Sequence, residues 1–388
     1  MIALEPTVPE QALAAMRAPF LAREAQPIDV AVMQPLSLLL DLSGEAMRSR
    51  LFVVQADGID EACLRPDFTI PVALAHMAKG APASSYRYEG KAFRVAPIGS
   101  GRSEEFLQIG LEVLGDDRPK ARDAELLVLA WQAAQAGGRG DLWIELGDVS
   151  LFSAFVDALG LAPSLAARLK RAFQRPRSLR AELERARTQE PPSREGDHMA
   201  TLLAKLPEAD AASALEELWA VAGVEPVGGR TADEIVQRLA ARARDRAAPR
   251  LSDVQFGLIE RFLSIHDTPA AALAAIGALA ETVGADLTRQ LADWRARLDL
   301  LETSGAPLSA MRLSPAFGRA FGYYDDFLFE VRSAALSAEE PVAAGGRYDS
   351  LLARLRVQSG GKTKAAFATG GAAGCIVRPW RAWTGSHA

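Results

Sequence analysis

The stretch 86–115 places the strongest constraint on what this chain can fold into. Its first part, residues 86–95, alternates between apolar and polar side chains as a half-buried β-strand does. Pro97 and the Gly-Ser-Gly sequence at 99–101 interrupt this alternation and mark a loop. The apolar face resumes at Phe106. The stretch therefore predicts two neighbouring strands joined by a glycine-containing loop.

Three polar residues of these strands point to a ligand pocket if they share the inner face of the sheet. Arg94, Gln108 and Glu112 would then direct a guanidinium, an amide and a carboxylate into one cavity. That mixture suits a zwitterion, with Arg94 for its carboxylate and Glu112 for its ammonium group. The alternative is an exposed hairpin with ordinary surface charges, and spacing alone favours this alternative.

The composition of the chain excludes several classes of protein. Its 388 residues are 49% hydrophobic and 24% charged, which is typical of a soluble globular protein, here with two lobes. The net charge of −5 does not favour a general nucleic-acid binder. Cys63 and Cys375 lie in no paired motif, and the four histidines are scattered, so we expect neither disulfides nor a metal site. Without a signal region or an apolar run of about 20 residues, we expect a cytoplasmic protein.

The pattern along the chain predicts an α+β protein in three parts. Residues 1–148 and 303–388 are rich in strand patterns and would form one sheet. Residues 149–302 are rich in Ala, Leu and Arg and would form a mostly helical insert between the two halves of that sheet. Capping-box patterns predict helix starts within the insert at Ser213 with Glu216, Thr231 with Glu234, and Ser252 with Gln255.

Glycines mark two further boundaries in the sheet-rich parts. Residues 37–43 are apolar enough for a short buried helix that ends at Gly44. The Gly-Gly-Arg-Tyr sequence at 345–348 predicts a turn into a helix over 349–355.

A basic segment lies within the predicted insert. Residues 168–187 carry eight basic side chains against Glu182 and Glu184. Such a segment is either a docking patch for an acidic partner or RNA, or a solvated helix face. The solvated face is the favoured interpretation.

Four blocks of sequence, in order, resemble one family. Residues 64–69 read Leu-Arg-Pro-Asp-Phe-Thr, close to the family's Leu-Arg-Pro-Glu-Gly-Thr. The stretch 86–115 resembles the second signature motif of class II aminoacyl-tRNA synthetases, in a form close to that of histidyl-tRNA synthetase. Residues 319–330 and 345–351 resemble two later blocks of that enzyme. The resemblance implies an antiparallel sheet flanked by helices, a helical insertion and a dimeric core.

The resemblance also implies an amino-acid pocket at matching positions. Asp67 stands where the family has a glutamate near the ligand ammonium, and Gln108 and Glu112 match residues that hold the α-amino group. Arg94 matches the arginine that holds a carboxylate or an α-phosphate. Arg319 and two tyrosines match the block beside the imidazole, although strand aromatics and a surface charge would give the same pattern. The implied pocket residues are Asp67, Thr69, Arg94, Gln108, Glu112, Arg319, Tyr323 and Tyr324.

The chain departs from the synthetase pattern where that pattern binds ATP. Ala96 replaces a glutamate that helps to hold adenine. In the third motif, Ala372 and Ala373 replace the Glu and Arg of Gly-Leu-Glu-Arg, so the cation beside the γ-phosphate is missing. Gly322 replaces an aspartate beside the histidine ring. Because few residues follow Ala373, we expect no anticodon-binding domain.

This combination resembles the ATP phosphoribosyltransferase regulatory subunits. The resemblance implies a subunit with no active site and no cofactor of its own, in a hetero-oligomer with a short-form catalytic subunit, at the first step of histidine biosynthesis. It further implies feedback inhibition by histidine, which must bind one state of the complex better than another. Histidine would bind either in the relict synthetase pocket or at the interface with the partner, and Gly322 weakens the first option.

Two alternatives come from other classes of protein. The first is an active synthetase-like enzyme that activates an amino acid or modifies a protein; the losses at Ala96, Ala372 and Ala373 oppose it. The second is an RNA-associated scaffold built on the segment 168–187, which the acidic net charge opposes.

Overall fold

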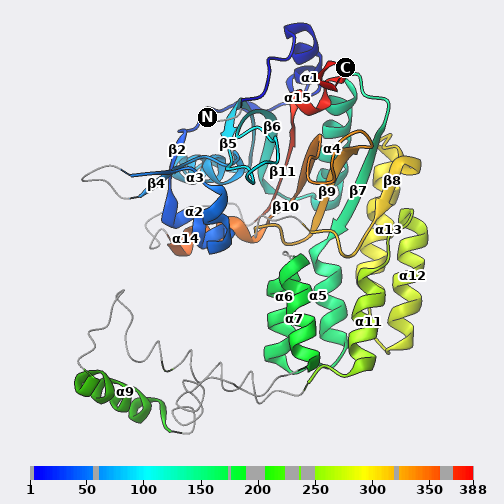
Figure 1. Cartoon of the computed structure of the whole chain (residues 1–388). Helices are drawn as coiled ribbons and strands as arrows, with labels where there is room; N and C mark the ends of the chain where they lie inside the picture. The colour runs from blue at the N-terminus through cyan, green and yellow to red at the C-terminus, as the bar shows by residue number, and fades with distance from the viewer. Residues whose placement is uncertain are drawn as a thin grey trace. The chain divides into compact units, whose positions relative to one another are not determined.

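The computed structural model of the chain divides into two compact units, which we describe separately (Figure 1). The first comprises Met1–Phe152 and Phe262–Ala388, and the second comprises Ser153–Arg261. Within the described residues, no helix combines the length and apolarity needed to cross a membrane. The structure describes residues 4–55, 61–173, 176–188, 206–222, 236, 250–318, 323–358 and 370–387.

A mixed sheet forms the centre of the first unit. Its neighbouring strands are antiparallel except at the two edges, where β1 pairs with β5 and β7 with β8 in parallel. Among the described residues, eight strands make up this sheet, in the order β1 (Gln26–Pro27), β5 (Ser84–Phe93), β6 (Glu105–Asp116), β11 (Gly371–Val377), β10 (Ala343–Arg347), β9 (Phe327–Ser333), β7 (Leu142–Asp148) and β8 (Met311–Leu313).

The register of β5 and β6 confirms the two neighbouring strands predicted from the stretch 86–115. Ser84 lies opposite Leu114 at one end, and Phe93 lies opposite Glu105 at the other. On its other side β6 pairs with β11. Since side chains alternate along a strand, every second residue from Phe106 to Leu114 lies on the same face of the sheet.

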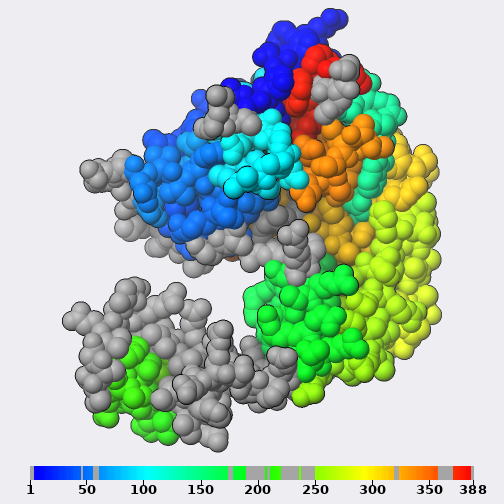
Figure 2. Space-filling view, in the orientation of Figure 1, coloured from blue at the N-terminus to red at the C-terminus, as the bar shows by residue number. Residues whose placement is uncertain are grey.

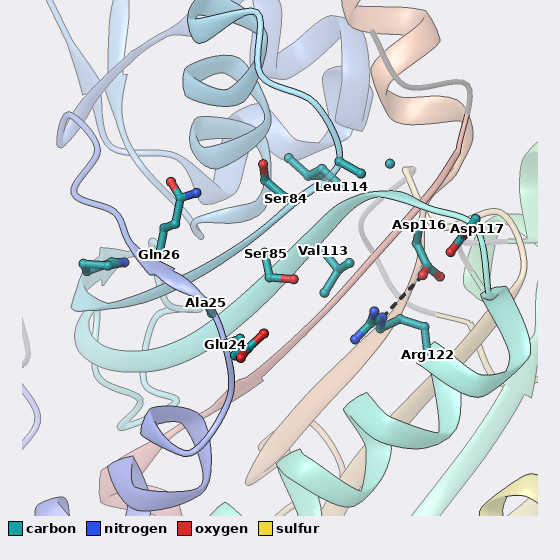
Figure 3. Close-up of a pocket in the computed structure, with 13 residues that line it drawn as sticks. Glu24, Ala25, Gln26, Ser84, Ser85, Val113, Leu114, Asp116, Asp117 and Arg122 are labelled. Carbon is teal, nitrogen blue, oxygen red and sulfur yellow. Dashed lines mark hydrogen bonds and ion pairs between the residues drawn. The ribbon is translucent and has the colours of Figure 1, made fainter.

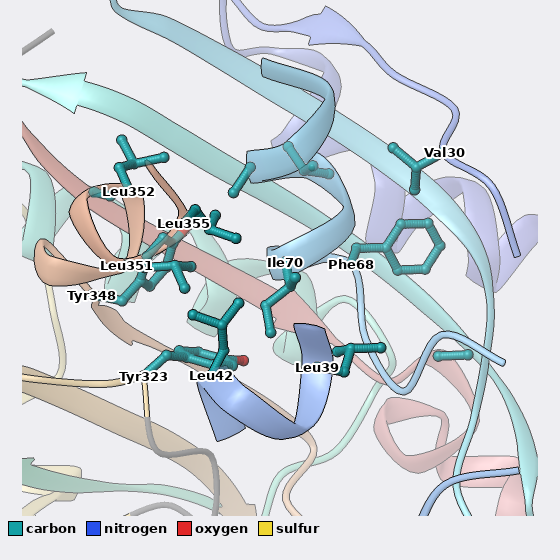
Figure 4. Packing of buried hydrophobic residues seen from close by; sticks show 14 of the residues in the cluster. Val30, Leu39, Leu42, Phe68, Ile70, Tyr323, Tyr348, Leu351, Leu352 and Leu355 are labelled. Atoms are coloured by element: carbon teal, nitrogen blue, oxygen red, sulfur yellow. The ribbon is translucent and has the colours of Figure 1, made fainter. Parts of the chain in front are cut away.

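Three helices cover that face: α2 (Leu36–Ser43), α3 (Thr69–Lys79) and α14 (Ser350–Gln358). The short leucine-rich α2 ends at Gly44, as predicted, with a φ of 87° that suits glycine. Its Leu39 and Leu42 pack in one hydrophobic cluster with residues from α3 and α14, such as Ile70 and Leu355 (Figure 4). Beside these helices lie a short 3₁₀-helix and a small antiparallel sheet: η1 (Glu45–Arg50), β2 (Met33–Pro35), β4 (Ala62–Leu64) and β3 (Val53–Val54).

The long helix α4 (Pro119–Gln135) lies against β9, β10 and β11. It begins with Pro119, which has no N–H to leave unpaired in the first turn. The remaining elements of this unit are α1 (Glu10–Leu21), α12 (Pro269–Thr282), α13 (Thr288–Thr303), η2 (Leu308–Ala310), α15 (Pro379–Ala382) and η3 (Thr384–His387).

A buried ionic network joins α4 to the sheet and to α13. Arg347 of β10 is fully buried and lies 2.8 Å from Asp123 of α4 and 3.5 Å from Asp116 of β6. Arg297 of α13 lies 3.1 Å from the same Asp123. Because a buried charge without partners is very costly, this network holds the three elements in one arrangement.

The two terminal segments lie side by side in this unit (Figures 1 and 2). Leu4 forms a bridge with Glu105 at the start of β6. Glu5 lies 2.6 Å from Arg378, and both side chains are buried.

The second unit contains α6 (Pro163–Phe173), α7 (Pro176–Thr188) and α9 (Glu208–Ala222), with most of α5 (Val149–Ala158) and α11 (Asp253–Leu263). The capping box before α11 is confirmed, because Ser252 and Gln255 each accept the other's backbone N–H at 3.1 Å. The box at Ser213 is wrong, since that residue lies inside α9. The box at Thr231 lies outside the described residues.

The second unit is shorter than the helical insert expected over 149–302. Trp294 of α13 donates a hydrogen bond to Asp148 of β7 at 2.7 Å, and this helix packs on α4. Helices α12 and α13 therefore belong to the sheet-containing unit.

The predicted turn at 345–348 is also wrong. Its two glycines lie in the buried strand β10, between β9 and β11. A Cβ atom on Gly346 would lie 2.8 Å from the ring of Tyr324. The glycine therefore admits an aromatic ring rather than a change of chain direction.

Candidate functional site

Glu112 lies at the centre of the predicted pocket, on the face of β6 that α3 and α14 cover. Its side chain is buried, and three hydroxyl groups donate hydrogen bonds to it. Thr69 Oγ1 lies 2.9 Å and the Tyr88 hydroxyl 3.0 Å from Glu112 Oε1, and the Tyr348 hydroxyl donates to Oε2. These donors come from α3, from β5 and from the segment between β10 and α14.

The environment of Glu112 opposes its negative charge. Burial raises the pKa of Glu112 to about 7, although the hydrogen bonds from Tyr348, Thr69 and Tyr88 lower it. The nearby carboxylate of Asp67 adds to the rise. The carboxyl group therefore titrates near neutral pH.

Asp67 extends the same hydrogen-bonded cluster. Its Oδ1 accepts the backbone N–H of Thr69 at 3.2 Å, and its Oδ2 accepts the hydroxyl of Tyr323 at 3.3 Å. The ring of Tyr323 packs on Tyr324 and Tyr348, with centroid distances of 4.8 and 5.8 Å. The structure thus brings five of the predicted residues together: Asp67, Thr69, Glu112, Tyr323 and Tyr324.

Glycines of β6 and β11 leave room for the side chains of this cluster to pack against the sheet. A Cβ atom on Gly374 of β11 would lie 1.7 Å from Glu112 Oε2. A Cβ atom on Gly110 of β6 would lie 2.4 Å from the Tyr88 hydroxyl. In this conformation the protein's own hydroxyl groups occupy the positions from which a ligand would donate to Glu112.

The other predicted residues lie elsewhere. Gln108 is buried on the same face of β6, and its Oε1 has no hydrogen-bond partner among the described residues. Arg94 follows β5, donates from Nε to the carbonyl of Pro66 at 2.8 Å, and places its guanidinium 5.3 Å from the centroid of the Phe106 ring. Arg319 lies outside the described residues, as does Gly322.

Tyr88 and Tyr348 donate to Glu112, although neither was predicted from the sequence as a site residue. Tyr88 stacks on Phe68, with ring centroids 4.3 Å apart and planes inclined by 9°. Burial raises the pKa of both tyrosines, so they stay protonated donors. Both belong to the blocks that resemble the synthetase, and this was the signal available for them.

The replaced ATP-binding positions have ordinary structural surroundings. Ala372 and Ala373 lie inside β11, opposite Leu114 and Val113 of β6. Ala96 donates its backbone N–H to Glu104 at 3.3 Å. Two arginines that were not predicted as site residues follow the other end of β11: Arg378 lies between β11 and α15, and Arg381 lies in α15.

A separate groove of about 690 Å³ lies at the other end of the hairpin, where β5 begins and β6 ends (Figure 3). Carboxylates, hydroxyl groups and one guanidinium line it, and the buried Asp116 lies 3.4 Å from Arg122. No predicted site residue lines this groove. Among the described residues, no group of three or more Asp, Glu, His or Cys side chains is placed to hold a metal ion.

Acidic neighbours pair with much of the basic segment 168–187. Arg168 and Arg185 both contact Glu182, Lys170 contacts Asp157, and Arg187 contacts Asp253. This pairing supports the solvated helix face rather than an open patch for an acidic partner.

The fold and the closed pocket define a class II, histidyl-tRNA-synthetase-like protein. The histidyl-tRNA synthetase family model matches residues 26–261. A solved ATP phosphoribosyltransferase regulatory subunit/histidyl-tRNA synthetase from Bacillus halodurans has a TM-score of 0.59 at 17% identity, covering 97% of this chain and 80% of that one. A histidine–tRNA ligase subunit from Alicyclobacillus acidocaldarius has a TM-score of 0.54 at 19% identity, covering 98% and 94%.

Curated relatives define the family more closely. An ATP phosphoribosyltransferase regulatory subunit of Chelativorans sp. (strain BNC1) is 36% identical over 343 residues, which cover 87% of this chain and 89% of the relative. The protein of that name from Brucella anthropi is 34% identical over 345 residues, covering 88% and 90%. The chain belongs to the family of ATP phosphoribosyltransferase regulatory subunits.

Proposed function

We propose that this chain is a non-catalytic regulatory subunit of ATP phosphoribosyltransferase, required for the first step of histidine biosynthesis. The observation that carries this proposal is the 36% identity to a regulatory subunit of that name, over 87% of this chain and 89% of the relative. The partner is a short-form catalytic subunit, and the two form a cytoplasmic hetero-oligomer. The buried, unpaired Cys63 and Cys375 are consistent with a reducing compartment.

The chemistry of the pocket supports a subunit with no reaction and no cofactor of its own. Glu112 already accepts three hydroxyl groups, so an amino group has to displace them before it reaches the carboxylate. Ala96 offers only its backbone where the synthetase pattern has a carboxylate for adenine. The binding free energy of any substrate of this pocket would be reduced by the free energy needed to displace these hydroxyl groups.

A homodimeric core is part of this proposal. The small sheet of β2, β4 and β3 and its flank expose the apolar side chains Val32, Met33 and Val53, which are 41%, 56% and 39% exposed. By register, Met33 lies opposite Leu64 and Val53 lies opposite Cys63, so these two side chains are on opposite faces of the small sheet. The homodimeric core therefore rests on the family resemblance.

Feedback inhibition by histidine completes the proposal, and it leaves two sites for histidine. In the relict pocket, the ammonium group of histidine would replace hydroxyl donors at Glu112. At an interface with the catalytic subunit, the closed cluster would stay as it is. Either site inhibits only if histidine binds one state of the complex better than the other.

Calorimetric titration of L-histidine tests the proposal, first into this subunit alone and then into its mixture with the short catalytic subunit. Glu112→Gln is the test variant, because glutamine keeps the shape and one acceptor oxygen. Glu281→Gln, on the exposed surface of α12, is the matched control.

Binding to the subunit alone that Glu112→Gln abolishes would place the effector in the relict pocket. Binding only to the mixture, unchanged in Glu112→Gln, would place it at the interface. No binding in either case would refute the feedback role, and failure of the subunit to activate the catalytic partner would refute the regulatory function itself. Amino-acid-dependent exchange of pyrophosphate into ATP would instead support the alternative of an active enzyme.

A further inference from the structure

A group of charged side chains lies on β7 and β9, near the edge of the large sheet. Glu145 of β7 lies directly opposite Glu330 of β9, and both are buried. Arg332 lies 2.8 Å from Glu330. The guanidinium of Arg332 also contacts two aromatic rings, at 5.6 Å from the centroid of Trp143 and 5.4 Å from that of Phe317. Two neighbouring carboxylates and one guanidinium leave this group with a net negative charge.

His266 faces this group from residues 264–268, which connect α11 to α12. Its Nε2 lies 3.2 Å from Glu145 Oε1, and its side chain is 50% exposed, whereas that of Glu145 is 8% exposed. Glu145 Oε1 has no hydrogen-bond partner among the described residues, so this contact lacks the geometry of a hydrogen bond. Its attraction therefore depends on a positive charge on the imidazole.

The charges around Glu145 balance only when His266 is protonated. Burial raises the pKa of Glu145, and Glu330 adds to the rise, whereas His266 and Arg332 lower it. Arg312 of β8 is opposite Glu145 in register, but its guanidinium donates to two backbone carbonyls of its own segment. Loss of the imidazole proton therefore leaves two buried carboxylates with one cation, and a buried charge without its partner is costly.

Residues 264–268 lie where the chain returns from the second unit, which ends at Arg261. The backbone of this segment is joined to the sheet through Asp267 and Leu313 of β8, which exchange hydrogen bonds of 3.3 and 2.8 Å. The carboxylate of Asp267 accepts the backbone N–H of Thr268 at 2.6 Å, just before α12. If the side-chain contact beside them weakens, these two backbone hydrogen bonds carry more of the attachment.

We propose that His266 and Glu145 form a proton-dependent latch, which holds residues 264–268 against β7 when the imidazole is protonated and loosens them when it is neutral. Imidazole groups change charge between pH 5 and pH 8. Deprotonation leaves the carboxylate of Glu145 buried beside Glu330, and movement of the segment away from β7 lets water reach it. The latch thus makes the local opening of this return segment depend on pH.

Hydrogen exchange of the full chain tests this inference, measured by mass spectrometry at pH 6 and pH 8.5 and corrected for intrinsic exchange rates. The readout is the protection of the backbone amides of Asp267 and Leu313. At pH 6 this protection should be about fivefold greater in the unmodified protein than in His266→Gln, the upper limit for a half-exposed ion pair. At pH 8.5 the two proteins should exchange alike. His387→Gln, which changes a histidine of η3, is the matched control and should match the unmodified protein at both pH values.

Glu145→Gln keeps the shape of the side chain and should lower the protection at pH 6 as His266→Gln does. Combining the two substitutions should cause no further loss, since each removes the same pair. Glu302→Gln, exposed on α13, is the control for this change.

A ratio of protection between the unmodified protein and His266→Gln that is the same at pH 6 and pH 8.5 would overturn the proposal. So would losses that simply add in the double variant. His266 is half exposed, so His266→Gln should fold and its pH comparison decides the matter even if Glu145→Gln does not fold. Neither the effector L-histidine nor the catalytic subunit enters this test, so its failure leaves the regulatory function untouched.

Discussion

The two ends of the β5–β6 hairpin neutralise buried charge in opposite ways. At one end, three neutral hydroxyl groups surround the carboxylate of Glu112. At the loop end, carboxylates pair with guanidinium groups: Glu339 pairs with Arg102 in a pair that is open to solvent. The pairs of Glu5 with Arg378 and of Glu340 with Arg381 are largely buried. Hydrogen bonds inside a core are insensitive to salt, whereas exposed ion pairs are weak and screened. The first end is therefore part of the folded core, whereas at the second end the pair between Glu339 and Arg102 is open to solvent and to salt.

Gly374→Ala should have the largest effect on stability, because its added methyl group would clash with the side chain of Glu112. The added Cβ atom would lie 1.7 Å from Glu112 Oε2, between two paired strands. We expect the free energy of unfolding to fall by about 3 kcal/mol, the upper end of the usual cost of overpacking. Chemical denaturation in urea measures this change.

Gly277→Ala is the matched control for that substitution. Gly277 lies in α12, where a Cβ atom would make an ordinary contact of 3.4 Å with Leu291. Alanine in a helix interior should stabilise the protein slightly. Equal stability of the two variants would show that the Glu112 cluster is loosely packed.

Glu112→Gln should remove a pH dependence that the carboxylate confers. The folded-state pKa of Glu112 is raised to about 7, above the ordinary value of 4.5 that we take for the unfolded chain. The folded protein therefore binds the extra proton more tightly, which stabilises it below pH 4.5. This stabilisation is lost as the pH rises through about 7.

The measurement for Glu112→Gln is urea denaturation of both proteins between pH 5 and pH 8. Relative to the variant, the unfolding free energy of the unmodified protein should fall by on the order of 2 kcal/mol across this window. A difference that stays constant with pH would mean that Glu112 titrates in its ordinary range.

Tyr348→Phe should have a smaller effect than either change above. It removes one of the three hydroxyl donors to Glu112 and leaves the ring in place against Tyr323. We expect a loss of about 1.5 kcal/mol at pH 8, where the carboxylate is charged, and a smaller loss at pH 5. Urea denaturation at both pH values measures it, and equal losses at the two would contradict a donor role toward the carboxylate.

Local sequence patterns predicted the individual strands and helices of this fold better than the way these elements pack together. Alternation with a glycine loop was enough for the hairpin, and an apolar run before Gly44 was enough for α2. The two glycines at 345–346 failed as a turn signal because the rings of Tyr324 and Phe329 fill the space beside a buried strand. Those rings lie in or just before β9, and only the pairing of β9 with β10 brings them against the glycines, so the glycine pattern alone does not contain this information.

The candidate site likewise divides into residues that the sequence indicated and residues whose role depends on how the chain packs. The family resemblance brought forward Asp67, Thr69 and Glu112, which the structure joins by hydrogen bonds. It did not indicate that Tyr88 and Tyr348 donate to Glu112, because that depends on how β5 and the residue after β10 are placed beside β6 in the folded sheet. The position of Arg378 and Arg381 near the predicted Arg94 was missed for a related reason: these two segments are far apart in sequence, and only the pairing of β11 with β6 brings them together.

Glu339→Gln should give the smallest change in stability and thereby separate the two ends of the hairpin. The exposed pair to Arg102 contributes at most about 1 kcal/mol, so the free energy of unfolding should fall by no more than that at low salt. In 1 M sodium chloride, where the Debye length is about 3 Å, the difference should disappear. Tyr348→Phe should keep its full effect in the same salt, because its hydrogen bond lies inside the core. If Glu339→Gln instead lost stability in a way that salt did not reduce, the pair between Glu339 and Arg102 would be a fixed part of the core.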